Sequence, residues 1–360
     1  MNVAYLRSMR LGVALALLLV VSVGAARAEE RASAQQDGPA VGVLTKGENA
    51  VVACYVRSEV APELQDLLGK LTDRTWTMLE EEDWDGLWAL SHADDANLSS
   101  KDMFVAGLTS AAERLGRPVE DSVDELFVFR FTGEFAGPAT CGSTALQDPN
   151  HVVVQVSSKA EPLALVLRRS KQPPFDRIIT FVFRGVDKSW RFAGLIGSDV
   201  AFLGKGARDY ANSAEQYGAA GDHLAQLAAL EIAHAFSKTA PFIERSASYE
   251  IARKLKALIG DSNRFDTVRN MKVGSHDYVI REVTIETTRT GIRPRLVYLS
   301  RYPIDDPEGA EEARELAAHI AQHYPATAKA FHSVLLEALA TSGAAGGKPA
   351  SKRYLETLVR

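Results

Sequence analysis

The spacing of apolar residues changes twice along this chain, and this change restricts the folds that the chain can adopt. Residues 62–79 and 100–115 carry apolar side chains three and four positions apart, which is the period of an amphipathic helix. Residues 126–196 instead hold short runs rich in β-branched and aromatic residues, separated by turn-forming residues. The helical period returns at residue 207. This order predicts an α+β protein, and the short connections favour an antiparallel sheet.

The first half is predicted to contain three helices followed by five strands. Pro62 begins the first helix, a short helix follows over 84–90, and Ser99 or Ser100 caps the third. Gly116 ends the third helix. The predicted strands cover residues 126–132, 151–157, 163–168, 177–184 and 189–196, and Gly137-Pro138 is among the expected turns.

The second half is predicted to be a mostly helical lobe that contains one β-hairpin. Helices are expected over residues 207–236 with a break at Gly218 and Gly221, and over 247–259, 308–324 and 325–339; the hairpin strands are 278–287 and 295–302. The predicted divisions are a signal peptide over 1–28, a flexible lead-in over 29–51, an α+β domain over 52–204, the helical lobe over 205–340 and a flexible tail over 341–360.

The N-terminus has the layout of a secretory signal peptide. Arg7 and Arg10 precede an apolar stretch over 11–23, and small residues precede a cleavage site between Ala28 and Glu29. The stretch of 13 residues is shorter than the roughly 20 of a membrane span. We therefore expect an exported protein, periplasmic or secreted, with no membrane span after cleavage. An uncleaved N-terminal anchor is the alternative.

Composition and charge exclude several classes of protein. A chain that is 46% hydrophobic and 24% charged is typical of globular proteins rather than disordered ones. The formal net charge is −5, and removal of the three arginines in residues 1–28 makes it −8. This balance offers no basic footprint, so nucleic acid is not an expected partner.

Cys54 and Cys141 are the two cysteines of the chain. Export implies an oxidising compartment, where two thiols usually form a disulfide. The bridge would close a loop of about 87 residues and stabilise the fold by about 4 kcal/mol in chain-entropy models. Cys141 as a nucleophile, with His151 ten residues later, is the alternative, although no family signature surrounds it.

The predicted elements of the first half follow one another in a recognisable order. They are the helix at 62–79, the segment Asp83-Trp84-Asp85-Gly86-Leu87-Trp88, the helix that ends in Leu115-Gly116-Arg117-Pro118, and the strands after it. In this order, residues 60–200 resemble the nuclear transport factor 2-like superfamily of cone-shaped, cystatin-like α+β proteins. The resemblance implies helices packed into the concave side of a curved antiparallel sheet, with a pocket between them. Some members are isomerases or dehydratases that use pocket Asp and His residues, and many only bind ligands or partners.

The catalytic residues of those enzymes have no counterparts that can be assigned here. His92, Asp94 and Asp95 fall in a predicted loop, and His151 begins a predicted strand. No Asp and His are spaced so that one pocket must hold both. We therefore predict no catalytic residue, no cofactor-binding residue and no cofactor.

His319 and His323 are weak candidates for metal ligands. They are four residues apart on a predicted helix, so both imidazoles lie on one face. The glutamate of the zinc-protease motif is absent because Ile320 occupies its position. Two surface histidines are the preferred interpretation, and no metal site is predicted.

Other reactive residue types have structural interpretations. His234 is expected to be a partly buried helical residue, Ser198 a loop or cap residue, and Asp305, Asp306 and Glu308 a turn and helix start rather than a calcium loop. Trp76, Trp84 and Trp88 are expected in the core, with a pocket lining as the alternative.

Two functions from different classes follow from these predictions. The first is an exported, non-catalytic module that binds an unknown small molecule or protein partner, because a complete fold pattern occurs without a catalytic constellation. The second is a small-molecule enzyme (an isomerase, dehydratase or hydrolase) with a pocket in residues 60–200 and a carboxylate or His151 as base.

Overall fold

The computed structural model describes residues 41–42, 51–91, 100–116, 118, 123–186, 189–289, 291–340 and 350–358. The predicted cleavage site at Ala28 and Glu29, and the loop residues His92, Asp94 and Asp95, lie outside this range. The chain forms two units, which are described separately. The first takes the chain up to Asp199 together with Lys238–Ser246, and the second takes Val200–Ser237 and Ala247–Arg360.

The helices of the first unit are those that the sequence predicts. They are α2 (Pro62–Glu80), α3 (Trp84–Leu90) and α4 (Lys101–Leu115). Asp83 caps α3 by accepting a hydrogen bond from the Gly86 amide at 2.9 Å. Ser100 caps α4 by accepting from the Met103 amide at 3.2 Å, and Gly116, with φ of +66°, ends it.

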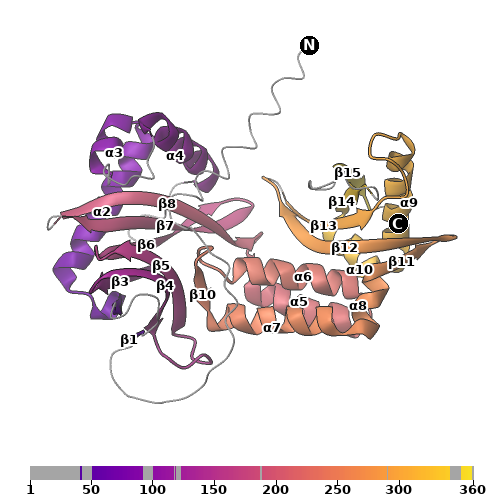
Figure 1. The fold of residues 1–360 in the computed structure, drawn as a ribbon, viewed down its shortest axis with the longest axis horizontal. Coiled ribbons are helices and arrows are strands. Elements are labelled where there is room, and N and C mark those ends of the chain that lie inside the picture. Colours follow the sequence, from indigo (N-terminus) through magenta and orange to yellow (C-terminus); the bar gives the residue numbers. More distant parts are fainter. Residues whose placement is uncertain are drawn as a thin grey trace, which may run out of the picture. The chain divides into compact units, whose positions relative to one another are not determined.

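A curled antiparallel sheet forms the middle of the first unit (Figure 1). Its strand order is β1-β2-β3-β6-β7-β8-β9, of which β9 and the last residues of β8 belong to the second unit. The strands are β1 (Val41–Gly42), β2 (Val52–Val56), β3 (Glu125–Phe131), β6 (Leu163–Gln172), β7 (Phe175–Val186), β8 (Ser189–Phe202) and β9 (Lys205–Gly206), and a short 3-10 helix η3 (Arg57–Glu59) follows β2. β1 falls inside the predicted lead-in, where it pairs with β2. Ser198 lies in β8, so its predicted loop position is wrong.

A second, three-stranded sheet corrects the prediction of one continuous meander. It holds β4 (Glu134–Gly142), β5 (His151–Lys159) and β10 (Ile243–Arg245) in the order β10-β5-β4. Gly137-Pro138 lies inside β4 and is not a turn. Proline is tolerated there because β4 is an edge strand of this sheet, where a missing amide costs no ladder bond.

The first unit therefore has three layers, and β3 shows how they are divided. Leu126 and Val128 belong to the core beneath α2, α3 and α4. On the opposite face, the rings of Phe129 and Phe131 stack with centroids 6.5 Å apart, and Phe131 lies 5.9 Å from Phe135 of β4. Alternate side chains of one strand thus serve two cores, so the helices cover one face of the curled sheet and the small sheet covers the other.

The second unit begins with helices. The predicted break within residues 207–236, which divides this segment into two helices, is confirmed. Its helices are α5 (Ala207–Ala219), α6 (His223–Phe236), α7 (Ser246–Gly260), α8 (Ser262–Arg269), α9 (Glu308–His323) and α10 (Pro325–Phe331). Gly221, with φ of +78°, occupies the break. α8 was not predicted.

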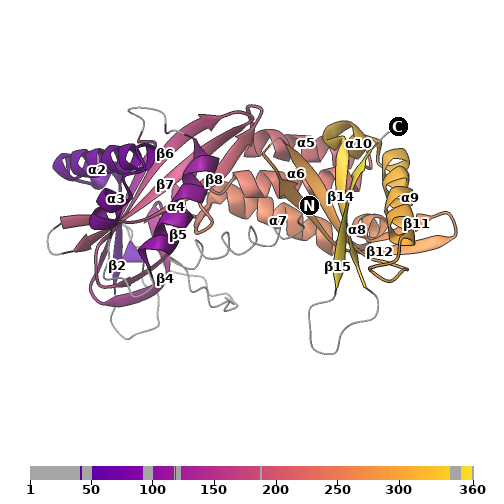
Figure 2. The same ribbon diagram turned by 90° about the horizontal axis from the view of Figure 1, so that it is seen from above.

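Five strands form the sheet of the second unit in the order β11-β12-β13-β14-β15. Figure 2 shows β14 and β15 of this sheet side by side. They are β11 (Asn270–Val273), β12 (His276–Thr287), β13 (Ile292–Leu299), β14 (Ser333–Leu339) and β15 (Ser351–Thr357). β13 and β14 are parallel, and the other neighbours are antiparallel. Leucine and alanine side chains of this sheet pack against α6 and α9 in one core.

Two predictions for the C-terminal part are wrong. The helix expected over 325–339 ends at Phe331, because His332 has φ of +54° and the apolar run 334–338 forms β14 instead. The tail expected to be flexible contains β15, which pairs with β14 over seven residues. A short buried apolar run has no period that separates helix from strand, and a charged edge strand resembles a tail.

The boundary between the units also differs from the predicted division at residue 204. Residues 238–246 return to the first unit because β10 pairs with β5. Such a three-residue strand has no sequence pattern of its own. Among the described residues, no helix is both long enough and apolar enough to cross a membrane.

Candidate binding cleft

A cleft of about 760 Å³ opens between the two sheets of the first unit. One wall comes from the end of β2, from η3 and from the start of β3. The other comes from β10 and from the β4–β5 hairpin. The lining residues are Val56, Arg57, Ser58, Gln65, Asp124, Glu125, Leu126, Phe127, Gly142, Ser143, Pro149, Asn150, Val152 and Arg245.

The predicted disulfide is confirmed and lies next to this cleft. Cys54 of β2 and Cys141 of β4 are bonded, with their Cα atoms 5.2 Å apart. Val56 is two residues after Cys54 and Gly142 directly follows Cys141, so each half of the bridge belongs to a different wall. The bond therefore fixes the separation of the two walls. Because Cys141 is disulfide-bonded, it is not a nucleophile in this state.

An ion pair joins the walls a second time. The Arg245 guanidinium of β10 contacts the Glu125 carboxylate of β3, across 120 residues of sequence. The two side chains are 20% and 34% exposed, so the pair borders solvent. At this exposure we expect it to contribute about 1 kcal/mol or less to stability.

Arg57 is held in place by the backbone and by Gln65. Its Nη1 donates to the carbonyl oxygen of Val123 at 2.6 Å, and its Nε donates to Gln65 Oε1 at 3.4 Å. Gln65 in turn donates to the carbonyl oxygens of Arg57 and Val60 at 2.9 and 2.7 Å. The start of η3 is thereby tied to the segment that precedes β3.

The β4–β5 hairpin forms a preformed rim. Gly142 has φ of +68°, and a Cβ there would collide with the carbonyl oxygen of Asn150. Asp148 accepts from the Asn150 amide at 2.8 Å. This bond, followed by one from Ser143, lowers the pKa of Asp148 below its ordinary value. The turn is thus closed by its own polar groups before any ligand arrives.

His151, the predicted alternative for a base, is part of this rim. Its side chain is only 3% exposed, and its Nδ1 lies 2.8 Å from the carbonyl oxygen of Ser143. A buried imidazole bonded to a turn carbonyl anchors the hairpin. His151 therefore has a structural role at the base of the β4–β5 hairpin.

The space between the helices and the curled sheet, where the family resemblance implies a pocket, is filled by aromatic side chains. Trp76 contacts Phe181 edge-to-face at 6.3 Å, Trp88 contacts Phe104 at 5.4 Å, and Phe192 contacts both Phe104 and Phe183. Trp76 and Phe104 are buried, and Trp84 and Trp88 pack against the same cluster. The predicted core position is confirmed for Trp76, whereas Trp84 and Trp88 are half-buried against this core and Trp84 also lines a second hollow, the alternative position.

A second hollow of about 460 Å³ lies between the starts of α3 and α4. It is lined mainly by acidic residues, of which Asp83 caps α3 and Asp85 pairs with Lys101. These contacts give Asp83 a capping role and Asp85 a pairing role.

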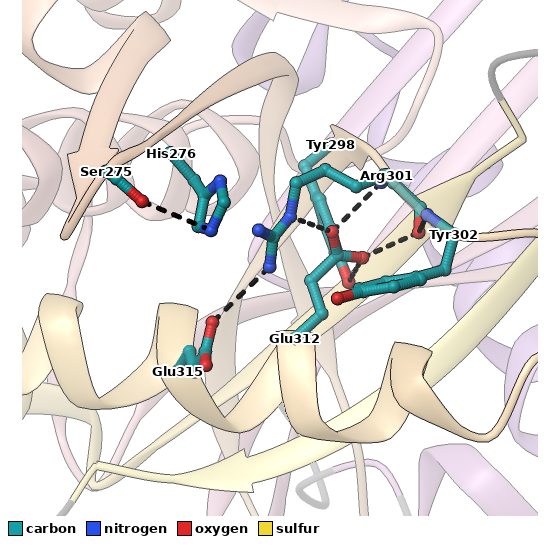
Figure 3. Close-up of polar contacts among 8 residues, drawn as sticks. Ser275, His276, Tyr298, Arg301, Tyr302, Glu312 and Glu315 are labelled. Carbon is teal, nitrogen blue, oxygen red and sulfur yellow. Dashed lines mark hydrogen bonds and ion pairs between the residues drawn. The ribbon is translucent and has the colours of Figure 1, made fainter.

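The strongest polar cluster of the second unit surrounds Glu312 (Figure 3). Its fully buried carboxylate accepts from Ser300 Oγ at 2.6 Å, from the Arg301 amide at 2.9 Å and from Arg301 Nε at 3.0 Å. Tyr298 adds a longer bond at 3.4 Å, and burial raises its pKa. Figure 3 shows the guanidinium of Arg301 between Glu312 and His276, with Glu315 on the same helix.

This cluster ties the end of β13 to α9. The Arg301 guanidinium lies over the rings of Tyr278 and Tyr302, 5.1 and 5.3 Å from their centroids. Burial raises the pKa of Tyr278 to about 12, so its phenol stays neutral at pH 7. The groups pair with one another, which is the arrangement of an anchoring network.

The remaining predicted candidates are not brought together. His319 and His323 lie on α9 with ring centroids 4.2 Å apart, and burial, with the neighbouring His323, lowers the pKa of His319. Among the described residues, no group of three or more His, Cys, Asp and Glu could hold a metal ion. His234 is half-buried on α6. Asp306 accepts from the Glu308 amide at 2.9 Å, which confirms the predicted turn and helix start.

Sequence reasoning missed Arg57, Asp124, Glu125 and Arg245 as neighbours of one cleft. Arg57 follows β2, Asp124 and Glu125 stand at the start of β3, and Arg245 ends β10, but nothing in the local pattern states which strands meet. Comparison with family models, with curated proteins and with solved structures gives no match for this chain.

Proposed function

We propose that this chain is an exported, non-catalytic binding module whose ligand occupies the cleft between the two sheets of the first unit. The observation that carries the proposal is a hollow of about 760 Å³ whose walls are joined by a disulfide and an ion pair. Clefts of roughly 300–1,000 Å³ with a few fixed polar groups are typical small-molecule sites. Fixed walls lower the ordering cost of binding.

Export is supported by two independent features. The first 28 residues have the layout of a signal peptide. Both cysteines of the chain are joined in a disulfide, which is the state favoured in an oxidising compartment. We therefore propose a periplasmic or secreted location.

We also propose that the first unit is a variant of the nuclear transport factor 2-like architecture. The order of α2, α3 and α4 before a curled antiparallel sheet supports this relation. The variant would differ in its ligand site, because aromatic side chains fill the space under the helices and the hollow lies on the other face of the sheet.

The rival function, a small-molecule enzyme, would have to use Asp124 as its base, because the other candidate groups are engaged. His151 is buried and bonded to Ser143, and Glu125 is paired with Arg245. Turnover of a compound that binds the cleft would favour the enzyme and overturn the non-catalytic proposal.

The proposal is tested by ligand-observed NMR of the purified, oxidised protein with a panel of amino acids, short peptides, monosaccharides and nucleotides. Ser58→Trp places an indole at the mouth of the cleft, and Leu203→Trp places one at a 69% exposed position elsewhere as the control. We expect binding that Ser58→Trp abolishes and Leu203→Trp leaves unchanged. Absence of any binder, or binders that both variants retain, would contradict the proposal.

A further inference from the structure

The charged residues of the cleft do not all neutralise one another. Its lining contains two arginines and two acidic residues and no lysine or histidine. Arg245 and Glu125 form an ion pair. Arg57 and Asp124 are left, one positive and one negative.

Arg57 is positioned to bind an anionic group. Its Nη1 and Nε are bonded to Val123 and Gln65, which fixes the plane of the guanidinium. Within the part of the chain that the structure describes, no carboxylate lies within ion-pair distance of it. A guanidinium held on two of its nitrogens still offers Nη2 to a carboxylate, the partner whose geometry it matches best.

Asp124 is positioned to bind a cationic group. Its amide donates to the carbonyl oxygen of Leu167 at 2.9 Å, which fixes the backbone at the start of β3. Its side chain is exposed and lines the cleft, and its carboxylate has no hydrogen bond or ion pair to any described residue. Asp124 directly follows Val123, the residue that holds Arg57, so the two unpaired charges belong to the same wall.

The space between the walls is apolar in part. Val56 and Pro149 line it from opposite sides, with the buried Leu126, Phe127 and Val152 behind. The volume of about 760 Å³ accommodates a ligand with a hydrocarbon side chain as well as its charged groups.

We infer that the cleft binds a dipolar ion that carries both a carboxylate and a primary ammonium group, that is, a free amino acid or a short peptide. The inference rests on the proposed binding function. The carboxylate lies on Arg57, the ammonium group lies on Asp124, and the apolar part contacts Val56 and its neighbours.

Other ligand classes fit less well. Asp124 and Glu125 repel a multiply charged phosphate, and the two arginines repel a polycation. A sugar is usually held on an exposed aromatic ring, whereas Phe127, the aromatic residue of the described lining, is 3% exposed.

Isothermal titration calorimetry with three probes tests the inference. The probes are leucine, the dipeptide leucyl-leucine, and N-acetyl-leucinamide, which has the same side chain and no charge. We expect one of the first two to bind, and the uncharged probe to bind at least about tenfold more weakly. The tighter of leucine and leucyl-leucine identifies the source of the ligand.

Variants locate the two charges. Arg57→Gln and Asp124→Asn are each expected to weaken binding about 10- to 100-fold, the usual effect of losing a hydrogen bond to a charged group. Arg74→Gln and Asp66→Asn, at exposed positions of α2 outside the cleft, are the charge-matched controls and should bind like the wild type. If Arg57→Gln disturbs the fold of η3, the affinity of Asp124→Asn for the same probe still tests the inference.

Two results would overturn the inference, and they separate it from the proposed function. Equal binding of N-acetyl-leucinamide, or unchanged binding by both cleft variants, would reject a dipolar ligand. If leucine and leucyl-leucine do not bind while glucose or another uncharged probe binds in a Ser58→Trp-sensitive way, the cleft is a binding site for a different class. If no probe of any class binds, both the inference and the proposed function fail.

Discussion

The two units use different chemistry to connect segments that are far apart in the sequence. In the first unit, a disulfide and an ion pair join two sheets around a hollow. In the second unit, which contains no cysteine, buried carboxylates make the corresponding connections. Asp222 caps α6 through the Ala225 amide at 2.8 Å and also accepts from Thr327 Oγ1 at 2.9 Å.

The difference follows from what each interior must contain. A buried carboxylate is stable only where several donors surround it, so it suits a filled interior such as the ends of α6, α10 and β13. A disulfide needs no surrounding donors and tolerates an empty space beside it. The comparison therefore predicts that the first unit depends on its covalent bond and that the second does not.

The largest expected effect is a loss of stability in the first unit alone. Replacing both Cys54 and Cys141 by alanine should lower its free energy of unfolding by about 4 kcal/mol, because the unfolded chain regains the freedom of an 87-residue loop. Trp76, Trp84, Trp88 and Trp190 all lie in this unit, so tryptophan fluorescence during urea unfolding reports on it specifically. Hydrogen exchange in α6 and α9 should stay unchanged; equal destabilisation of both units would contradict the comparison.

The matching substitution lowers the stability of the second unit. Asp222→Ala removes a buried acceptor from the amides of Ala225, Ala326 and Thr327 and should destabilise this unit by about 3 kcal/mol. The readout is amide exchange in α6 and α10. Asp277→Ala, at an exposed position of β12, is the control, and a similar effect of both substitutions would reject the role of Asp222.

A smaller effect sharpens the description of the cleft rim. Gly142→Ala should cost about 2 kcal/mol, because a positive φ and a collision with the Asn150 carbonyl act together. Gly204→Ala has a similar φ of +75° but open space around it, so about 1 kcal/mol is expected. Thermal unfolding compares the stability of the two variants. Equal losses of stability would show that no close contact with the Asn150 carbonyl constrains the backbone at Gly142.

The smallest expected effect concerns pH and the second unit. In the folded chain, burial lowers the pKa of His319 below its ordinary value of 6.5. As the pH falls below 6.5, the unfolded chain therefore binds more protons than the folded one. Stability of the second unit should therefore fall as the pH is lowered through 6.5. His319→Gln should reduce this dependence, measured as the unfolding midpoint at pH 7.5 and 5.5, and an unchanged slope would contradict the assignment.

Periodic segments with end signals were predictable from the sequence. α2 begins at Pro62 and α4 is capped by Ser100, as expected, because these signals are local. β4 was missed because Gly137-Pro138 also occurs in turns, and only its place at a sheet edge makes proline acceptable. The apolar run of β14 has no period that separates strand from helix, so the sequence predicts a helix there.

The cleft illustrates a different limit of prediction. The disulfide could be inferred from two cysteines and an export signal without knowledge of the fold. Arg245 and Glu125 are 120 residues apart, and their pairing depends on β10 returning to the small sheet. No local pattern encodes that return, so the charged residues of the cleft became visible only in three dimensions.

The most direct test of the account is hydrogen exchange of the oxidised protein with and without saturating leucine or leucyl-leucine. We expect the ligand to slow exchange at the cleft, in residues 56–58, 123–127 and 142–152, and to leave exchange in α6 and α9 unchanged. Protection confined to the second unit, or no protection at concentrations that saturate binding, would contradict it.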